Sequence, residues 1–407
     1  MKRKLFYFEI SKGFALLALI LAGLHWLFRY SPLLLDENIH FHQITSFLNH
    51  DGSEQVATML PTYHWILAFF ASVAGDQSEP TLRLLSLGFS LFFLLAVLWT
   101  VYAVDPERPL LKTMQMATLP VIFPFLPLIY TDIAALIFPA LAFGYLFRRK
   151  IFMVSLMSFI GLAFRQTNII WLLMFYCITY VQYFPGKPSV ASLYQHSLSA
   201  PFFIFGIALF AAFILLNGGI AMGGWKDSHV IDGVYFSNIF FFLITFSIVY
   251  CPKIIARLPR ITHHLLRHRV LQIAVFVFLL SYGFLFEISH EWNLSRAEPP
   301  LLRNLILQFL FDHPLAFSLA SLPATLALLF LWTEPTQHPY GKLLYLFSLL
   351  LFLPIALVEP RYHMMTFAGF VLLSPFAGTR VETMQLLWQT MLSAGIVWGH
   401  YKIAFFL

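Results

Sequence analysis

Apolar runs separated by short polar breaks extend over nearly the whole chain. A helix of about 20 apolar residues can cross the hydrocarbon core of a bilayer, and runs near this length recur. The pattern predicts an all-α polytopic membrane protein, a transmembrane bundle of about 11–14 helices. The expected spans are 11–29, 81–104, 112–129, 133–147, 151–164, 168–184, 199–216, 239–251, 270–287, 315–332, 342–358, 364–379 and 385–405.

Composition supports the same class. The 407 residues are 59% hydrophobic and 11% charged, too few charges to cover the surface of a soluble protein of this length. The net charge of +6 comes mostly from short basic clusters between spans. Such clusters orient helices in the membrane, so we expect no nucleic-acid partner. Two cysteines provide no disulfide framework.

The basic clusters also predict the topology. "MKRK" at the N-terminus, Arg148–Lys150 and the loop 252–269 should all be cytoplasmic. Five apolar runs lie between the first two clusters, and the shortest, 61–74, begins at a proline. We expect this run to be a juxtamembrane or re-entrant helix. The remaining runs form one transmembrane domain over 1–407, with external loops at 30–80, 217–238 and 288–314. The first helix has no small-residue cleavage site and is expected to remain uncleaved.

With this threading, the unusual polar residues gather on the non-cytoplasmic side. Ionisable residues at span ends are costly and are functional candidates by default. The segments are "LLLDENIHFHQ" (33–43), Tyr130–Asp132, Arg165–Gln166, the loop 217–233 and "VEPRYHMM" (358–365).

Simpler interpretations of the charged candidates remain open. Asp36 or Glu37 could be a solvated span end, and Asp132 could cap the helix that follows it. Arg165 follows a run that barely spans the membrane and therefore needs a partner, which a structural salt bridge would supply.

The histidines and glycines of this face are equally ambiguous. His40, His42 and His229 could be ordinary interfacial histidines, although Asp36 with the first two leaves weak binding of a divalent metal open. The glycine pairs within 217–224 follow no strand and match no nucleotide-binding pattern.

Together these residues suit one kind of chemistry. Carboxylates can act as a general base toward a hydroxyl, and arginine and histidine can bind a phosphate leaving group. An enzyme that moves a sugar from a lipid phosphate needs both functions. Because the donor is already activated on its lipid, no nucleotide-binding domain is required.

The residues also resemble a known family. The acidic first loop, the short helix and "LRLLSLGFSLFFLLAV" resemble the GT-C membrane glycosyltransferases, as does "EPRYHMM" near the end. "LDENIHFHQ", "FRQTNIIW" and "NGGIAMGGWKDSHV" are similar to three motifs of the dolichyl-phosphate-glucose alpha-1,2-glucosyltransferase family. The third loop departs by an extra Gly-Trp, and Glu359-Pro360-Arg361 stands where an Asp-Asn-Arg-type run is more usual.

The resemblance implies an inverting transfer of a hexose, with glucose as the expected sugar. Asp36 is implied as the base that deprotonates the acceptor, with Glu37 as the reserve candidate. The residues implied to bind donor or acceptor are Asp132, Arg165, Gln166, Lys226, Asp227, His229, Glu359, Arg361, Tyr362 and His363. Among these, Arg361 with Tyr362 and His363 is implied to clamp the phosphate, and Glu359 to orient it.

The implied partners are a polyprenyl- or dolichyl-phosphate-linked sugar, a lipid-linked or other glycan acceptor and membrane lipid. The compartment is either a bacterial inner membrane, with a periplasmic site, or the endoplasmic reticulum, with a lumenal one. Two other classes remain as alternatives: a transporter or flippase, which usually carries its charges near mid-membrane on repeated, broken helices, and a glycan polymerase or ligase.

Overall fold

The computed structural model describes residues 2–49, 55, 57–224, 226, 233–293, 296–297, 301–302 and 304–402. Apart from one pair of two-residue strands, the regular elements of these residues are helices, so the predicted all-α class is confirmed. The chain divides into two compact units. The first unit comprises Met1–Met116 and Phe125–Val230, and the second Ala117–Pro124 and Ile231–Leu407. That the two act as a single domain stays a prediction.

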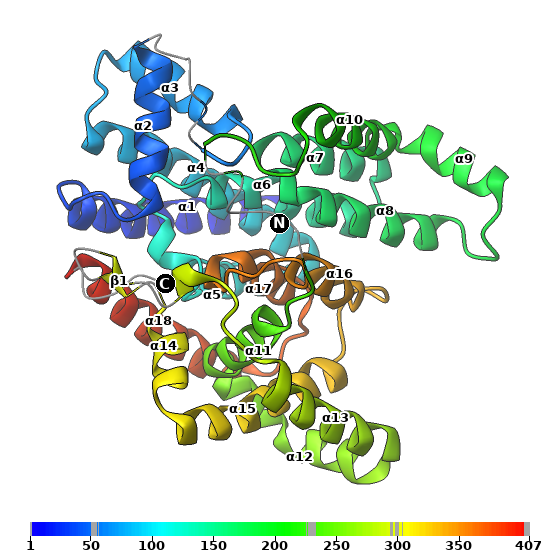
Figure 1. Ribbon diagram of the computed structural model, residues 1–407. Helices are drawn as coiled ribbons and strands as arrows, with labels where there is room; N and C mark the ends of the chain where they lie inside the picture. Colours follow the sequence, from blue (N-terminus) through cyan, green and yellow to red (C-terminus); the bar gives the residue numbers. More distant parts are fainter. Residues whose placement is uncertain are drawn as a thin grey trace. The chain divides into compact units, whose positions relative to one another are not determined.

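The first unit is built around α4, α6 and α7 (Figure 1). Its helices are α1 (Lys2–Phe28), α2 (Asp36–Leu48), α3 (Thr62–Ala74), α4 (Glu79–Val104), α6 (Thr131–Phe147), α7 (Ile151–Phe164), η2 (Gln166–Asn168), α8 (Ile169–Tyr183), α9 (Val190–Ser199) and α10 (Pro201–Asn217). Two short elements, α5 (Pro109–Ala117) and η1 (Phe123–Phe125), lie where the chain passes between the units.

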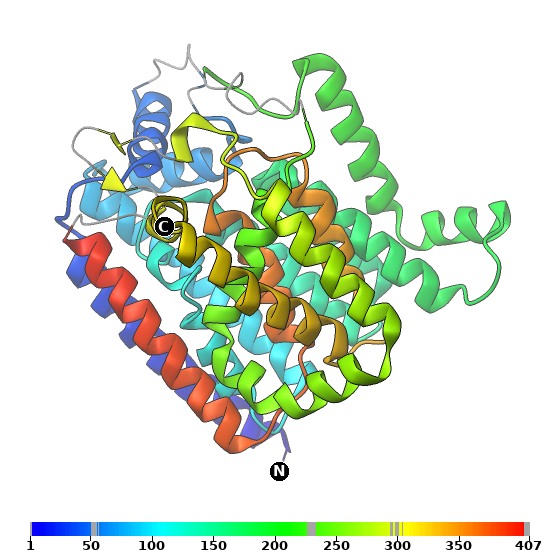
Figure 2. The same ribbon diagram turned by 60° about the horizontal axis from the view of Figure 1, so that its bottom comes forward.

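The second unit centres on α11 and α15, which pack against each other; α13 runs beside α15 (Figure 2). Its elements are α11 (Ser237–Val249), α12 (Cys251–Arg267), α13 (Arg269–Leu285), η4 (Glu291–Asn293), β1 (Arg296–Ala297), β2 (Leu301–Leu302), α14 (Leu305–Asp312), α15 (Pro314–Thr333), α16 (Leu343–Phe352), η5 (Pro360–His363), α17 (Met364–Leu373) and α18 (Thr379–Tyr401). The two strands form an antiparallel pair.

Several helices are apolar enough to cross a membrane. Three pass by length and hydropathy among the described residues: Ser11–Phe28, Glu79–Val104 and Pro314–Thr333. Two bent pairs, α9 with α10 and α11 with α12, raise the number to five if each pair forms one broken span. The protein is therefore an integral membrane protein with several passes, while the expected total of about 13 spans stays a prediction.

The apolar run 112–129 is not one continuous helix, contrary to the sequence expectation. Only α5 and η1 form helix here. Pro120, Pro124 and Pro127 explain the interruption, because a proline inside a helix removes a hydrogen bond and clashes with the preceding turn. Hydroxyls of α4 bind the broken segment: Ser86 donates to the carbonyl of Leu128 and Ser90 to that of Leu126, both at 2.7 Å.

The first predicted external loop contains two helices instead of one. The short helix expected over 61–74 is confirmed as α3, which ends at Gly75. Gly75 has φ +67°, a left-handed conformation that glycine adopts without the steric cost of a Cβ. The acidic segment 36–48, expected as loop, forms α2 and packs against α3.

Close packing of α4 on α6 holds the second half of α6 in place. The Thr100 hydroxyl donates to the Ala140 carbonyl at 2.8 Å. A Cβ on Gly144 would collide with Trp99 and Thr100, so this crossing requires glycine, as is common where membrane helices approach closely. The packing places Thr131 and Asp132, the first residues of α6, in the buried interior of the first unit.

Candidate active site in the first unit

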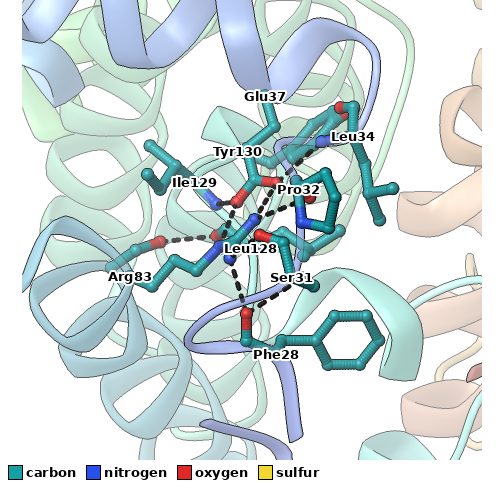
Figure 3. Close-up of polar contacts among 10 residues, drawn as sticks. Phe28, Ser31, Pro32, Leu34, Glu37, Arg83, Leu128, Ile129 and Tyr130 are labelled. Carbon is teal, nitrogen blue, oxygen red and sulfur yellow. Dashed lines mark hydrogen bonds and ion pairs between the residues drawn. The ribbon is translucent and has the colours of Figure 1, made fainter. Parts of the chain in front are cut away.

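A buried ion pair connects the acidic motif to α4. Arg83 donates from Nε to Oε1 of Glu37 and from Nη2 to Oε2, both at 2.8 Å, and both side chains are fully buried (Figure 3). Each Glu37 oxygen also accepts one backbone amide, from Ile129 and from Leu34, at 3.0 Å. The Glu37 carboxylate therefore accepts four hydrogen bonds.

The remaining donors of Arg83 are used as well. Nη1 donates to the carbonyls of Phe28 and Ser31 at 2.5 and 2.8 Å, and Nη2 donates to that of Pro32 at 3.2 Å. A guanidinium has five N–H groups, and all five have acceptors here. Because donor and acceptor capacities are both filled, this pair has little capacity left to bind a ligand.

Asp36 differs from its neighbour Glu37. It is the first residue of α2 and is half-buried, whereas Glu37 is fully buried. The residue before it, Leu35, has φ +44° and ψ −114°, a backbone conformation that leucine rarely adopts. Of the two carboxylates implied by the resemblance, Asp36 is thus the more accessible.

A second ion pair connects α6 and the end of α7. The guanidinium of Arg165 donates from Nη1 to Oδ1 of Asp132. The carboxylate of Asp132 is 3% exposed and the guanidinium 16%. Asn168 holds the two helices together, since its Nδ2 donates to the carbonyls of Ala135 and Gly161 at 3.0 and 2.8 Å.

Arg165 uses less of its donor capacity than Arg83. Its side chain makes this one hydrogen bond to the part of the chain that the structure describes, so four of its five N–H groups remain for a ligand. The helix cap proposed for Asp132 is not formed as such, because the N-cap residue is Tyr130 and makes no side-chain cap. The ion pair considered for Arg165 from the sequence is formed, while the role of Arg165 as a substrate-binding residue stays a prediction.

Gln166 connects the glycine-rich loop with residues 58–60 of the first loop. Its Nε2 donates to the carbonyls of Thr58 and Ile220 at 2.7 and 3.1 Å, and its Oε1 accepts the Leu60 amide at 3.3 Å. The backbone of Met222 also donates to the Thr58 carbonyl at 3.0 Å. The first loop, "FRQTN" and the glycine-rich loop therefore meet around one buried side chain.

The loop after residue 224 is only partly described. Lys226 is exposed, and its backbone amide donates to the Gly223 carbonyl at 3.3 Å. Asp227 and His229 lie outside the described residues. Their assignment, like that of Lys226, stays a prediction.

The two histidines of the acidic motif lie in different environments. His42 is exposed, whereas His40 is buried with its Nδ1 2.9 Å from Nε2 of His64 on α3. Burial, with a smaller effect of the His40 ring, lowers the pKa of His64 well below its ordinary value. Among the described residues, no group of three His, Cys, Asp or Glu side chains could hold a metal ion.

The late motif belongs to the second unit. Arg361 forms an ion pair from Nε to Oε2 of Glu359, and both side chains are buried. Asparagines hold the preceding residues: Asn293 donates to the Val358 carbonyl at 2.9 Å, and Asn238 to that of Leu357 at 3.1 Å. Tyr362 is half-buried, with its ring centroid 5.7 Å from the Arg361 guanidinium carbon.

His363 is surrounded by aromatic rings. Its ring centroid lies 4.7 Å from that of Phe352, 5.4 Å from Phe242 and 6.0 Å from Phe241. Burial lowers the pKa of His363 to about 3, so its imidazole is neutral at physiological pH. These surroundings are those of a core side chain, and they do not favour its expected contact with a phosphate.

Sequence reasoning missed Arg83 and Asn168 as organising residues. Both lie inside segments quoted for the resemblance, but Arg83 is embedded in an apolar run and Asn168 follows the more conspicuous Arg165 and Gln166. The signal available for Arg83 was the free-energy cost of an unpaired charge inside an apolar run. A buried arginine requires an anionic partner, and Glu37 was a carboxylate without an assigned one.

Comparison with known proteins supports the resemblance in part of the chain. Residues 31–192 match the DIE2/ALG10 family. Three curated relatives carry the name Dol-P-Glc:Glc(2)Man(9)GlcNAc(2)-PP-Dol alpha-1,2-glucosyltransferase. That of Candida albicans is 31% identical over 28% of this chain and 27% of its own length. That of Yarrowia lipolytica is 30% identical over 33% and 30%, and that of Debaryomyces hansenii 27% identical over 32% and 32%.

The resemblance stated from the motifs is confirmed over this stretch, which contains Asp36, Glu37, Asp132, Arg165 and Gln166. The matched part spans about three-tenths of each relative's length. The family match ends before the glycine-rich loop and the late motif. No solved structure matches the chain significantly.

Proposed function

We propose that this protein is an inverting glycosyltransferase that moves glucose from a polyprenyl- or dolichyl-phosphate carrier to a lipid-linked glycan. The relatives' names give dolichyl-phosphate-glucose as donor and a lipid-linked oligosaccharide as acceptor. The observation that carries the proposal is that Gln166 of "FRQTNIIW" binds both the glycine-rich loop, at Ile220, and residues 58–60 of the first loop. The acidic motif joins them through Gln43, whose side-chain oxygen accepts the amide of Ala57 at 3.1 Å. These hydrogen bonds join parts of the chain that are far apart in sequence and that resemble the same family.

Asp36 is the proposed base, because it is the accessible carboxylate of the acidic motif. It takes the proton of the acceptor hydroxyl while that oxygen attacks the anomeric carbon of the sugar. The bond between this carbon and the phosphate oxygen breaks, and the electron pair leaves with the lipid phosphate. One carboxylate suffices for such a displacement, and no covalent intermediate on the protein is required.

Arg165 is the proposed phosphate ligand in the first unit. The unused N–H groups of its guanidinium can bind phosphate oxygens and stabilise the charge that develops as the sugar leaves. Asp132 orients the guanidinium through their ion pair. In the second unit, Arg361 with Glu359 and Tyr362 remains a further proposed phosphate site, and Lys226, Asp227 and His229 remain proposed contacts to donor or acceptor.

The proposal places the reaction on the non-cytoplasmic side of the membrane, in the periplasm or in the endoplasmic reticulum lumen. The test uses membranes that contain this protein or its Asp36→Asn variant, supplied with radiolabelled polyprenyl-phosphate-glucose. Label transferred to lipid-linked or other glycan is counted. A matched variant, Asn38→Asp, adds a carboxylate at an exposed position of the same helix and controls for general effects on α2.

We expect the parent and Asn38→Asp proteins to transfer label and the Asp36→Asn protein to lose transfer by at least about a hundredfold, within the range that a positioned base contributes. Equal transfer by Asp36→Asn would remove Asp36 as the base and direct attention to Asp132. If the parent transfers neither glucose nor any other hexose from such a carrier, the glycosyltransferase proposal is wrong and a transporter or flippase becomes the better interpretation.

A further inference from the structure

We propose that Arg83 and Glu37 are positioning residues that hold the turn before α2 and thereby present the Asp36 carboxylate to the acceptor. This inference rests on the proposed function, because it concerns the same base. Neither residue of the pair would contact a substrate. Their effect would pass through the backbone of residues 31–35, which connects α1 to α2.

The pair of Arg83 and Glu37 has no hydrogen-bonding capacity left for another role. The Glu37 carboxylate accepts four hydrogen bonds, from Arg83 twice and from the amides of Leu34 and Ile129. The Arg83 guanidinium donates five. A saturated, fully buried pair is suited to fixing geometry, unlike the partly exposed guanidinium of Arg165.

The hydrogen bonds of this pair hold the backbone between α1 and α2. Arg83 donates to the carbonyls of Phe28, Ser31 and Pro32, at the end of α1 and in the turn after it. A cation at a helix C-terminus also complements the helix dipole. Glu37 then binds the amide of Leu34. The backbone on the N-terminal side of Asp36 is thus held at four points by one pair (Figure 3).

A further contact completes the arrangement from α6. The Tyr130 hydroxyl donates to the Leu34 carbonyl at 3.0 Å, so both backbone groups of Leu34 are bound by side chains. Tyr130 lies two residues before Asp132, the partner of Arg165. Tyr130 therefore connects the turn that presents Asp36 to the segment that contains Asp132, which positions the proposed phosphate ligand.

The backbone conformation of Leu35 is strained. At φ +44° this residue occupies the left-handed half of conformational space, which is unfavourable for a side chain with a Cβ. Such a conformation persists only where the surroundings enforce it. The bonds to Leu34 on one side and the Glu37 carboxylate on the other supply this constraint, and Asp36 is the residue between them.

The experiment compares Glu37→Gln and Arg83→Lys with the parent in reconstituted, full-length protein. Glutamine has one acceptor oxygen, so it cannot serve the amides of Leu34 and Ile129 together. Lysine keeps the charge but lacks the planar fork that reaches several acceptors. Glu382→Gln is the matched control, because Glu382 forms a buried ion pair with Lys253 at 2.9 Å in the second unit. It makes the same chemical change as Glu37→Gln and therefore controls for the general loss of stability on breaking a buried pair.

Two readouts are taken. The first is hydrogen exchange at the amides of Leu34 and Ile129, which does not depend on any activity. The second is kcat and KM for polyprenyl-phosphate-glucose. We expect at least one of the two amides to exchange about tenfold faster in Glu37→Gln. We also expect kcat to fall about a hundredfold in both variants, the cost of displacing a catalytic group by about 1 Å, with KM changed less than about threefold and the control unchanged in both readouts.

Three outcomes would overturn the inference, and they are distinguishable. Unchanged exchange at both amides would show that the pair does not hold the turn, whatever the activity. Faster exchange with kcat retained would show that the turn does not position the base. A parent protein that transfers no sugar from any such carrier would refute the proposed function, and the positioning role with it, while the exchange data would still report whether the turn depends on the pair.

Discussion

Asp132 and Arg165 lie 33 residues apart in the chain and form an ion pair, which is the one side-chain hydrogen bond that Arg165 makes to the described residues. All five donors of Arg83 are bound. The two arginines of this unit therefore differ in how much hydrogen-bonding capacity they have left. An arginine with filled donor capacity stabilises the fold. An arginine that is held by one carboxylate and partly exposed is prepared to bind an anion.

The first prediction concerns Arg165. In Arg165→Lys the charge is kept but the planar fork is lost, so we expect KM for polyprenyl-phosphate-glucose to rise about tenfold, equivalent to about 1.4 kcal/mol. Competition by unglycosylated polyprenyl phosphate should weaken in parallel. Arg148→Lys serves as the control, because Arg148 stacks on Trp99 in the same unit. Equal KM values for the parent and Arg165→Lys would contradict the role in phosphate binding.

The second prediction concerns stability. Glu37→Met or Arg83→Met leaves one charge buried without its partner and should lower the free energy of unfolding by about 3–5 kcal/mol. The double variant removes both charges, so its loss should be well below the sum of the single losses. Denaturant unfolding in detergent measures these values.

The exposed pair of Glu107 and Arg108, at 3.7 Å, provides the comparison. Glu107→Gln should change the free energy of unfolding by less than about 0.5 kcal/mol. Additive losses in the double Met variant would mean that Arg83 and Glu37 do not stabilise each other.

The third prediction concerns Gln166. Its side chain makes three hydrogen bonds to the loops at 58–60 and 220. In Gln166→Ala the groups that it bound lose their partner, and we expect the Leu60 amide to exchange about 5- to 30-fold faster, the effect of about 1–2 kcal/mol. Gln272→Ala is the control, since the side chain of Gln272 donates to the carbonyls of Leu265 and Leu266 in the second unit. Unaltered exchange at Leu60 would show that Gln166 does not join the loops.

The fourth prediction concerns pH. The pKa of His363 is about 3 in the folded protein because of burial and about 6.5 when unfolded. The unfolded chain therefore binds the proton first as the pH falls. The contribution of the neutral imidazole to the free energy of unfolding is fully present above about pH 6.5. It is lost as the pH falls toward 3, by up to about 1.4 kcal/mol per pH unit.

His363→Leu removes this titration and should flatten the dependence of the thermal midpoint on pH between 7.5 and 5. The difference from the parent isolates His363 from the other histidines. Donor KM at pH 7.5 should stay within about threefold of the parent if the imidazole is a core group. A large rise in KM would instead support the phosphate contact implied by the resemblance.

The sequence by itself determined the class of protein and the location of the candidate residues along the chain. Hydropathy is averaged over residues that are neighbours in the sequence, so it identified α1, α4 and α15 as apolar helices and α3 as a short one. It failed at 112–129, where three prolines interrupt an otherwise apolar run. It also failed at α2, whose polar residues resemble a loop until the helix packs against α3.

Only the tertiary structure decided which charges pair. Glu37 meets Arg83 across 46 residues, and Gln166 reaches Leu60 across 106. Neither separation follows any helical period, because each contact depends on how helices from distant parts of the chain pack. Hydrogen-bond capacity is likewise a property of the assembled site. Asp36 and Glu37 are adjacent carboxylates of one motif, but their environments differ. Glu37 is surrounded by four hydrogen-bond donors, whereas Asp36 remains accessible at the start of α2.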